Sequence, residues 1–218
     1  MKTVALVPIK LNSQRLPHKN ILNIAGKPLC WHICNRLCSV KMIDEVYVYC
    51  SDEMVKEYIP QEAIFKRRSE SLDADEVKGF DIYRAFMDEV DADVYVLAHT
   101  TSPFIRRETI EDALGHVLSG KNDSAFSAER IQTFAWYDNA PINYNLNYVT
   151  RTQDMKPIWV ETSAFYIFRK EIFSVSKRRI GFKPYIKEVT GIEALDIDEK
   201  KDYDLACKMA EIEGISYE

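Results

Sequence analysis

A short segment near the N-terminus gathers side chains that can bind phosphate. Residues 10–20 contain the cations Lys10, Arg15 and Lys19 together with amide and hydroxyl side chains. A triphosphate carries spread negative charge that several fixed donors bind well, and its α-phosphorus becomes open to attack once that charge is neutralised. The segment contains neither the GxGxxG dinucleotide pattern nor the GxxxxGK[ST] phosphate loop. Taken alone, its composition fits either a phosphate-binding loop or a solvated surface.

A pair of carboxylates near the C-terminal end is the second chemical candidate. Asp196 and Asp198 are separated by one residue, so on a strand both would point to one face and could share a divalent cation. Mg²⁺ binds a few carboxylates together with phosphate oxygens and water. The alternative is a surface turn before a helix, in which Asp198 or a neighbour acts as the N-cap.

A second basic cluster interrupts a chain that is acidic overall. Lys66, Arg67 and Arg68 are consecutive, although the formal net charge is −5. An acidic chain disfavours nucleic acid or an anionic membrane as the main partner, whereas local basic clusters favour an anionic small molecule. A solvated edge is the alternative interpretation of this cluster.

The cysteines and the apolar segments indicate the cellular compartment in which the protein is expected. Five cysteines in 218 residues, without a segment that resembles a signal peptide, favour reduced thiols over a disulfide framework. Cys30, Cys34 and Cys38 share a helical stripe from which His32 points away, so we interpret them as core residues and not as a metal site. The chain has no apolar run of about 18 residues, and we therefore expect a soluble, cytoplasmic protein.

Strands and helices alternate along the first 128 residues. Apolar runs predict strands at residues 3–9, 45–50, 63–66, 94–98 and 124–128, and helical spacing predicts helices at 27–40, 54–59, 75–90 and 109–119. This alternation is typical of a mostly parallel sheet with helices on both faces. Ligands of such sheets bind beyond the carboxyl ends of the strands, and segment 10–20 follows the first strand directly.

The pattern changes after residue 128. A polar, aromatic and turn-rich stretch at about 132–159 predicts an excursion of hairpins. A strand at 164–168, a last short strand at 194–197 and a terminal helix at 201–213 follow it. We therefore expect one domain over residues 1–218, from which this excursion projects.

Several separated stretches match, in order, the motifs of one enzyme family. VPIK at 7–10, RLPHKNI at 15–21 and GKPL at 26–29 match the N-terminal signature of that family in order. VLAHTTSP at 96–103 resembles a family strand that ends in LQxTSP, and FYIF at 165–168 resembles its late strand. DID at 196–198, followed by DYDLA at 202–206, resembles its ending. The chain therefore resembles the sialic-acid and ketodeoxyoctulosonate cytidylyltransferases. The resemblance runs from about residue 3 to residue 210 and implies a three-layer, Rossmann-like nucleotidyltransferase fold.

The resemblance also implies an activity and a site. It implies a Mg²⁺-dependent transfer of CMP from CTP to an acidic sugar, with release of pyrophosphate, for surface glycan biosynthesis. Catalytic roles would belong to Lys10, Arg15, Lys19 and Asp198, and the metal to Asp196 and Asp198. The implied nucleotide-binding set is Lys10, Asn12, Ser13, Arg15, Lys19, Asn20 and Arg68, with Arg67 left open as base reader. The implied acceptor-binding set is His99, Thr101, Ser102, Glu161, Thr162 and Phe165.

Some positions depart from the family pattern. Lys10 stands where the family usually has arginine, which exchanges a bidentate fork for a point charge. His99 replaces a glutamine that contacts the sugar, and residues 161–163 read ETS instead of ENG. Because the last two departures fall on the acceptor side, they leave the identity of the sugar open. His99 could bind an acceptor carboxylate when protonated, act as a base, or support the turn at 100–103.

The excursion at about 132–159 resembles the dimerisation segment of the family, which predicts a homodimer. Two alternatives to the main prediction remain. One is an enzyme of the same fold that uses another nucleotide or a phosphorylated acceptor, and the other is a nucleotide-binding module with a decayed acceptor site.

Overall fold

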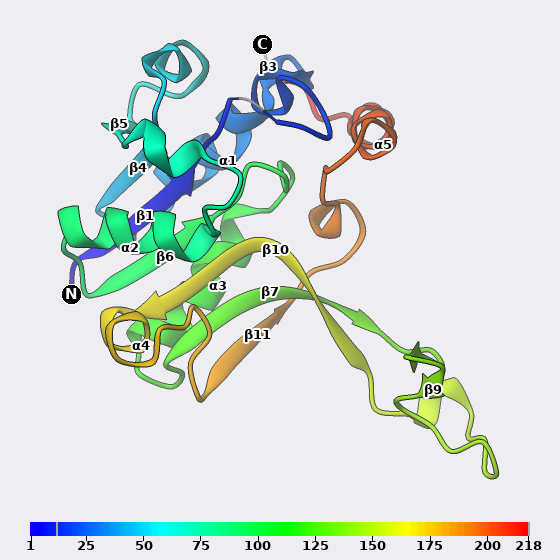
Figure 1. Ribbon diagram of the computed structural model, residues 1–218. Coiled ribbons are helices and arrows are strands. Elements are labelled where there is room, and N and C mark those ends of the chain that lie inside the picture. The colour runs from blue at the N-terminus through cyan, green and yellow to red at the C-terminus, as the bar shows by residue number, and fades with distance from the viewer. Residues whose placement is uncertain (12, 218) are drawn as a thin grey trace.

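A mixed sheet of seven strands forms the centre of the molecule, in the order β11-β7-β10-β6-β1-β4-β5 (Figure 1). The computed structural model describes residues 1–11 and 13–217. Parallel pairs join β1 to β4 and β6, β4 to β5, and β7 to β11, whereas β10 runs antiparallel between β6 and β7. The strands are β1 (Thr3–Pro8), β4 (Glu45–Cys50), β5 (Ile64–Arg67), β6 (Val94–Ala98), β7 (Ser124–Ile131), β10 (Ile158–Arg169) and β11 (Pro184–Glu188). The predicted mostly parallel sheet is confirmed.

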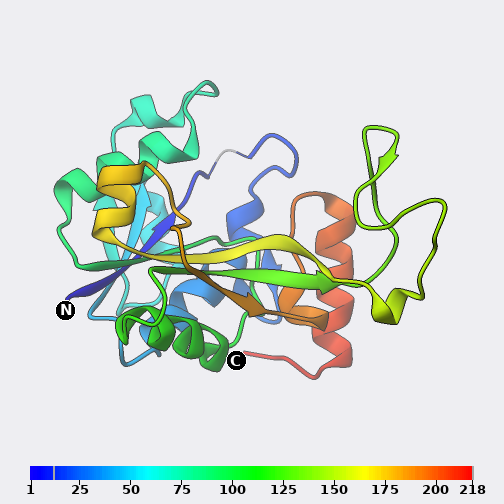
Figure 2. The same ribbon diagram turned by 90° about the horizontal axis from the view of Figure 1, so that it is seen from below.

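Helices cover both faces of this sheet. They are α1 (Leu29–Cys38), α2 (Gly79–Glu89), α3 (Arg107–Leu118), α4 (Lys170–Ser176) and α5 (Lys200–Ile212). Successive residues of β1 point to opposite faces, so Val7 packs with the buried sides of α1 and α3, and Leu6 packs with those of α2 and α4. Figure 2 shows the sheet between these two layers, with α3 on one side and α4 on the other. The three-layer, Rossmann-like fold follows from this alternation.

A third hydrophobic cluster holds α5 beside the segment that follows β1. Leu16 and Ile24 from the N-terminal part pack with Ile197, Ala206 and Ala210 from the C-terminal part. The shorter elements of the body are η1 (Lys19–Ile21), β2 (Asn23–Ile24), β3 (Lys27–Pro28), η2 (Glu53–Tyr58), η3 (Glu70–Asp73) and η5 (Gly191–Ala194). The segment that follows β1 and the C-terminal helix α5 therefore lie side by side.

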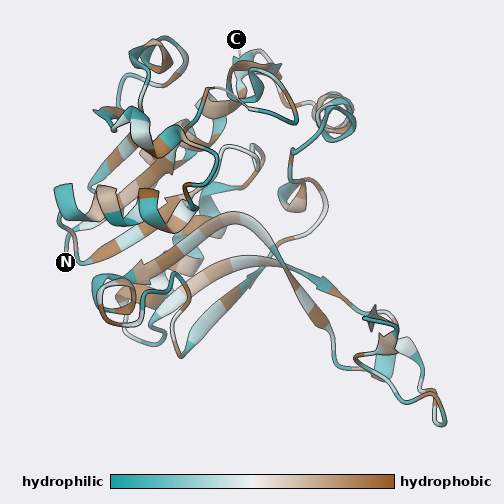
Figure 3. Ribbon diagram, in the orientation of Figure 1, coloured by the Kyte–Doolittle hydropathy of each residue, from teal (hydrophilic) through white to brown (hydrophobic). Residues whose placement is uncertain are grey.

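An arm extends from the ends of β7 and β10, away from the body of the molecule (Figure 1). It contains β8 (Trp136–Tyr137), β9 (Ala140–Pro141) and η4 (Thr152–Asp154). Large apolar side chains are exposed on it, with Trp136 at 54%, Tyr137 at 77% and Tyr148 at 76%. Hydrophobic stretches are visible along this arm in Figure 3. The expected hairpin excursion corresponds to this arm.

The prediction of a last strand at 194–197 is wrong. Residues up to Ala194 form η5, and Asp196 and Asp198 lie in the irregular segment between η5 and α5. The seventh strand is instead β11, which begins at a proline and has only half-buried to exposed residues, so its apolar pattern is weak. The expected helix at 75–90 begins only at Gly79, and α4 was not expected.

No helix within residues 1–11 and 13–217 is both long and apolar enough to span a membrane.

Candidate active site

A cleft of about 670 Å³ opens at the carboxyl ends of β1 and β6. Its lining brings together the segment after β1, the residues 99–101 after β6 and the residues 196 and 198 before α5. These are the stretches in which the sequence placed its main candidates. Sheet topology explains their meeting, because neighbouring parallel strands end at the same edge.

Asp198 lies between two cations of the N-terminal segment. Arg15 donates to both carboxylate oxygens, from Nη1 to Oδ2 at 2.7 Å and from Nη2 to Oδ1 at 3.0 Å. The buried Lys19 donates to Oδ1 at 3.2 Å and to the carbonyl of Ile197 at 2.9 Å. Partial burial opposes ionisation, but the hydrogen bonds and charges of Lys19 and Arg15 keep the pKa of Asp198 below its ordinary value. Asp198 is therefore ionised at neutral pH.

The backbone around Asp198 is fixed at the start of α5. The amides of Asp198 and Glu199 donate to Oδ2 of Asp202 at 3.1 and 2.8 Å, as part of a capping box. Ile197 donates its amide to the carbonyl of Thr101 at 2.9 Å, and its side chain is buried in the third hydrophobic cluster. Because Ile197 points into the core, the carboxylates on either side of it both reach the cleft, although they do not lie on a strand.

Asp196 and Asp198 form a donor set that suits Mg²⁺. Burial first, and then the negative charge of Asp198, raises the pKa of Asp196, whereas a hydrogen bond with Thr101 opposes the shift. A divalent cation between these carboxylates would relieve their repulsion. Within the described part of the chain, no group of three or more acidic, histidine or cysteine side chains could hold a metal. Phosphate oxygens and water would have to complete the shell, as is common for Mg²⁺.

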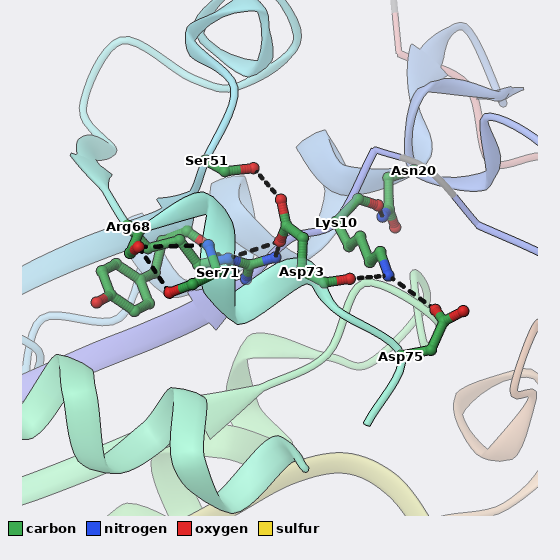
Figure 4. Close-up of polar contacts among 9 residues, drawn as sticks. Lys10, Asn20, Ser51, Arg68, Ser71, Asp73 and Asp75 are labelled. Atoms are coloured by element: carbon green, nitrogen blue, oxygen red, sulfur yellow. Dashed lines mark hydrogen bonds and ion pairs between the residues drawn. The ribbon is translucent and has the colours of Figure 1, made fainter. Parts of the chain in front are cut away.

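The segment after β1 is tied to the neighbouring strand ends. Asn20 donates to the carbonyl of Lys10 at 2.6 Å and accepts a hydrogen bond from Thr100 at 2.6 Å. Lys10 donates to the carbonyl of Asp73 and pairs with Asp75 at 3.5 Å (Figure 4). Asn20 therefore positions the backbone of the segment, and Lys10 is directed into the cleft. Ser13 also lines the cleft, whereas Asn12 lies outside the described residues.

The structure separates Arg68 from Arg67. The Arg68 side chain is 1% exposed; it pairs with Asp73 and donates to the carbonyl of Tyr49 at 3.2 Å (Figure 4). It lines a cavity of about 260 Å³ that also contacts Lys10 and His99. The Arg67 side chain is 59% exposed and pairs with Glu53 and Glu70. Arg67 lines a different cavity, of about 660 Å³, which also contacts Lys10. Of the two neighbours, Arg68 is the one that shares a cavity with His99.

His99 lines the cleft and is held in one tautomer. One ring nitrogen, Nδ1, lies 2.7 Å from the carbonyl of Ser163, which can only accept, so Nδ1 carries the proton. Nε2 lies 3.3 Å from the hydroxyl of Tyr83, which therefore donates to it. Burial lowers the pKa of His99, so the ring is uncharged at neutral pH. This arrangement disfavours the expected role of a protonated His99 that binds a carboxylate.

A backbone irregularity brings Ser163 to His99. The pairing register of β10 with β7 shifts between Glu161 and Tyr166, and Ser163 has a φ of 59°. Positive φ is uncommon in a non-glycine residue. The local distortion turns the Ser163 carbonyl toward the imidazole and places Ser163 on the cleft wall.

The predicted acceptor-binding residues do not all reach the cleft. Thr101 lines it with His99. Ser102 is fully buried, Phe165 belongs to the core, and the Thr162 hydroxyl donates to Ser127 at 2.8 Å. These three side chains face the interior and are not part of the proposed acceptor site. Glu161 is held near the cleft, because Tyr166 donates to it at 2.6 Å.

Arg179 lines the cleft and was not predicted. It belongs to the loop between α4 and β11, and its Nη2 donates to the Tyr166 hydroxyl at 2.9 Å. The guanidinium lies 3.7 Å from the centre of the Tyr166 ring and 3.5 Å from the Glu161 carboxylate. The basic run 177–179, in the loop before β11, is the sequence signal that could have indicated Arg179.

Comparisons with known proteins show the family of this chain. The family model described as "Cytidylyltransferase" matches residues 4–218. An N-acylneuraminate cytidylyltransferase of Streptococcus agalactiae is 25% identical over 214 residues, which cover 93% of this chain and 52% of that protein. The chain thus spans about half the length of that relative.

Two further relatives are covered over nearly their whole length. The CMP-N,N'-diacetyllegionaminic acid synthase of Legionella pneumophila is 26% identical, with 97% of each chain covered. The solved structure of a CMP:2-keto-3-deoxy-manno-octonic acid synthetase complexed with CTP superposes with a TM-score of 0.71 at 22% identity, and covers 97% of this chain and 100% of its own. The structural likeness supports the fold.

Proposed function

The chain belongs to the cytidylyltransferase family, and from this premise we propose that it transfers CMP from CTP to an acidic sugar. Pyrophosphate is the second product. The observation that carries the proposal is the meeting of Arg15 and Lys19 with Asp198 in one cleft at the ends of β1 and β6. Transfer at the phosphorus of a nucleoside triphosphate needs cations that neutralise the triphosphate. It also needs a carboxylate that can hold a metal.

The reaction is a displacement at the α-phosphorus. The bond from the sugar oxygen to phosphorus forms, the bond from phosphorus to the bridging oxygen of pyrophosphate breaks, and the sugar hydroxyl gives its proton to water. Lys10, Arg15 and Lys19 would bind the phosphate oxygens and neutralise the charge that accumulates on the leaving group. Mg²⁺, held by Asp196 and Asp198, would supply further charge neutralisation at the phosphates. Asn20 would keep the segment that carries these cations in place.

The base of the nucleotide would lie in the smaller cavity beside Arg68. Cytosine presents acceptors at O2 and N3, which require donors from the protein. The contacts of Arg68 with Asp73 and Tyr49 use three of the five N–H donors that an arginine carries. The ion pair with Asp73 fixes the guanidinium plane, so the remaining donors have a defined direction. These contacts support Arg68 as the base reader.

The arm supports a homodimer. Exposed Trp136, Tyr137 and Tyr148 give it an apolar surface at a distance from the body of the molecule. Aromatic side chains of this kind are enriched at protein interfaces. We propose that a second copy of the chain covers this surface.

A direct experiment tests the activity. Purified protein with Mg²⁺ is mixed with each of the four nucleoside triphosphates and with acidic sugars, with and without a phosphate group. We expect pyrophosphate release with CTP and an unphosphorylated acidic sugar. Release with another triphosphate, or only with a phosphorylated acceptor, would contradict the proposal.

A further inference from the structure

Arg179 differs in position from the other cations of the cleft. Among the described residues, the lysines and arginines that line it are Lys10, Arg15, Lys19 and Arg179. The first three belong to the segment after β1, where Arg15 and Lys19 pair with Asp198, and Lys10 pairs with Asp75. Arg179 comes from the loop between α4 and β11, and its partners Tyr166 and Glu161 belong to β10. The cleft therefore has a phosphate half with three cations and a second half with one.

The guanidinium of Arg179 is held in a fixed orientation. It stacks on the Tyr166 ring, with 3.7 Å between its carbon and the ring centre, and donates to the Tyr166 hydroxyl at 2.9 Å. Tyr166 is itself buried and donates to Glu161 at 2.6 Å, and Glu161 lies 3.5 Å from Arg179. Stacking on a buried ring and two polar partners restrict an otherwise flexible side chain. A restricted guanidinium loses less entropy when it binds an anion.

This arginine remains accessible to a ligand. Its side chain is 37% exposed, and that of Glu161 is 43% exposed. A single nitrogen, Nη2, makes both the hydrogen bond to Tyr166 and the ion pair with Glu161. A planar guanidinium can bind a carboxylate through two parallel N–H donors, and such pairs are among the strongest hydrogen bonds in proteins. Because the neighbouring His99 is held as a neutral ring by Ser163 and Tyr83, Arg179 supplies the positive charge at this wall.

We propose that Arg179 binds the carboxylate of the acceptor sugar and so selects acidic acceptors. This inference rests on the proposed function, since it assigns the acceptor half of the same cleft. Arg179 would orient the sugar so that its hydroxyl faces the α-phosphorus, while the cations of the opposite wall bind the triphosphate. The sugar carboxylate would either bind the guanidinium together with Glu161 or take the place of Glu161.

The test compares an acid with its own carboxamide. Three acids serve as probes: N-acetylneuraminate, N,N'-diacetyllegionaminic acid and 3-deoxy-manno-octulosonate. The acid that gives pyrophosphate with CTP is converted to the carboxamide, which keeps its shape and loses its charge. Specificity constants for the two compounds are then measured with the wild-type protein and with the variants Arg179→Met, Arg179→Lys and Arg178→Met. Arg178 is the matched control, because it is the adjacent cation and lies over the Phe182 ring.

We expect the wild-type protein to prefer the acid by about 10- to 100-fold, the range of a charge-assisted pair. Arg179→Met should reduce this preference to near unity by raising the KM for the acid, while the KM for CTP stays within about twofold. Arg179→Lys should keep part of the preference, since it keeps the charge and loses the fork. Arg178→Met should retain the wild-type preference.

Two results would overturn the inference. If Arg179→Met and Arg179→Lys lower the rates with acid and carboxamide by the same factor, Arg179 only supports the fold. If Arg179→Met retains the preference for the acid, another group binds the carboxylate. Absence of pyrophosphate with every acid and the wild-type protein is a different outcome, because it rejects the proposed function itself and this inference with it.

Discussion

Arg15 and Asp198 lie 183 positions apart in the sequence and are joined by two hydrogen bonds of 2.7 and 3.0 Å. The pair connects the segment that follows the first strand to the start of the last helix. Lys19 reinforces it from a buried position. The candidate phosphate-binding cations and the candidate metal-binding carboxylate are therefore parts of one assembly that exists only in the folded chain.

The first prediction concerns Asp198. Asp198→Asn removes a negative charge and should lower the Mg²⁺-dependent transfer rate by about 100-fold or more, because metal binding and charge neutralisation are both affected. CTP binding without Mg²⁺ should be unchanged or tighter, since Arg15 and Lys19 no longer pair with a carboxylate. Initial rates with Mg²⁺ measure the first effect, and calorimetric titration of CTP with and without Mg²⁺ measures the second. Asp204→Asn is the control, because Asp204 pairs with Lys200 on the exposed side of α5; a variant Asp198→Asn with wild-type stimulation by Mg²⁺ would refute the metal assignment.

The second prediction separates the two neighbouring arginines. Arg68→Met should lower the free energy of unfolding by about 2 kcal/mol, because it removes the ion pair with the partly buried Asp73 and the hydrogen bond to the carbonyl of Tyr49. The same variant should lose the preference for CTP over UTP. Arg67→Met should change the free energy of unfolding by less than about 0.5 kcal/mol, since Arg67 is exposed. Urea unfolding and initial rates with both nucleotides provide the measurements, and a CTP preference that depends on Arg67 would reverse the assignment.

The third prediction concerns the arm. Light scattering at micromolar concentration should give about twice the chain mass of 25.3 kDa. Replacing Trp136 and Tyr137 together by serine should shift the protein toward the monomer, because their exposed rings would form part of the interface. Val175→Ser serves as the control, since Val175 is equally apolar and 80% exposed on the body of the molecule. A monomeric wild-type protein, or the same loss of mass in the control, would exclude the arm as the dimer interface.

The fourth prediction follows from the buried histidine. Burial lowers the pKa of His99 below its ordinary value of 6.5. The unfolded chain therefore takes up a proton near pH 6.5 that the folded chain does not, so the free energy of unfolding falls as the pH drops below 6.5, until the folded pKa is reached. His99→Gln should make this fall shallower but should not abolish it, because burial also lowers the pKa of His32.

Nuclear magnetic resonance titration of the imidazole carbons gives a direct measurement of this state. The signal that disappears in His99→Gln should still report a neutral ring at pH 6.5. A midpoint at or above 6.5 for that signal would show that His99 is not held as the neutral tautomer between Ser163 and Tyr83.

Much of the fold follows from local patterns in the sequence. The strand at Val94–Ala98 and the helices around Ile33 and Leu114 have strong apolar spacing, so their positions were predictable. The short run 194–197 has apolar residues like those of a strand. In the structure it follows η5 as an irregular segment, which the hydrogen bond from the Ile197 amide to the Thr101 carbonyl holds in place. Local composition cannot distinguish a short buried strand from an extended segment that one buried side chain anchors.

The site was predictable where its residues are close in sequence or follow a strand. Lys10, Arg15 and Lys19 follow the first strand, whereas Asp198 was expected after a strand at 194–197 that is an irregular segment in the structure; all four line one cleft. Arg179 was missed, because its role depends on Tyr166 and Glu161 of β10, which reach it only through tertiary packing. A run of three cations before a returning strand has no periodicity that would separate a ligand-facing arginine from an exposed one.

Phosphorus magnetic resonance of the products tests the central claim most directly. The protein is incubated with Mg²⁺, CTP and the acidic sugar that supports turnover. Transfer of CMP predicts a new phosphodiester signal and pyrophosphate in equal amounts, both lost together in Asp198→Asn. The appearance of CDP and orthophosphate, or of a phosphorylated sugar without CMP, would contradict the account.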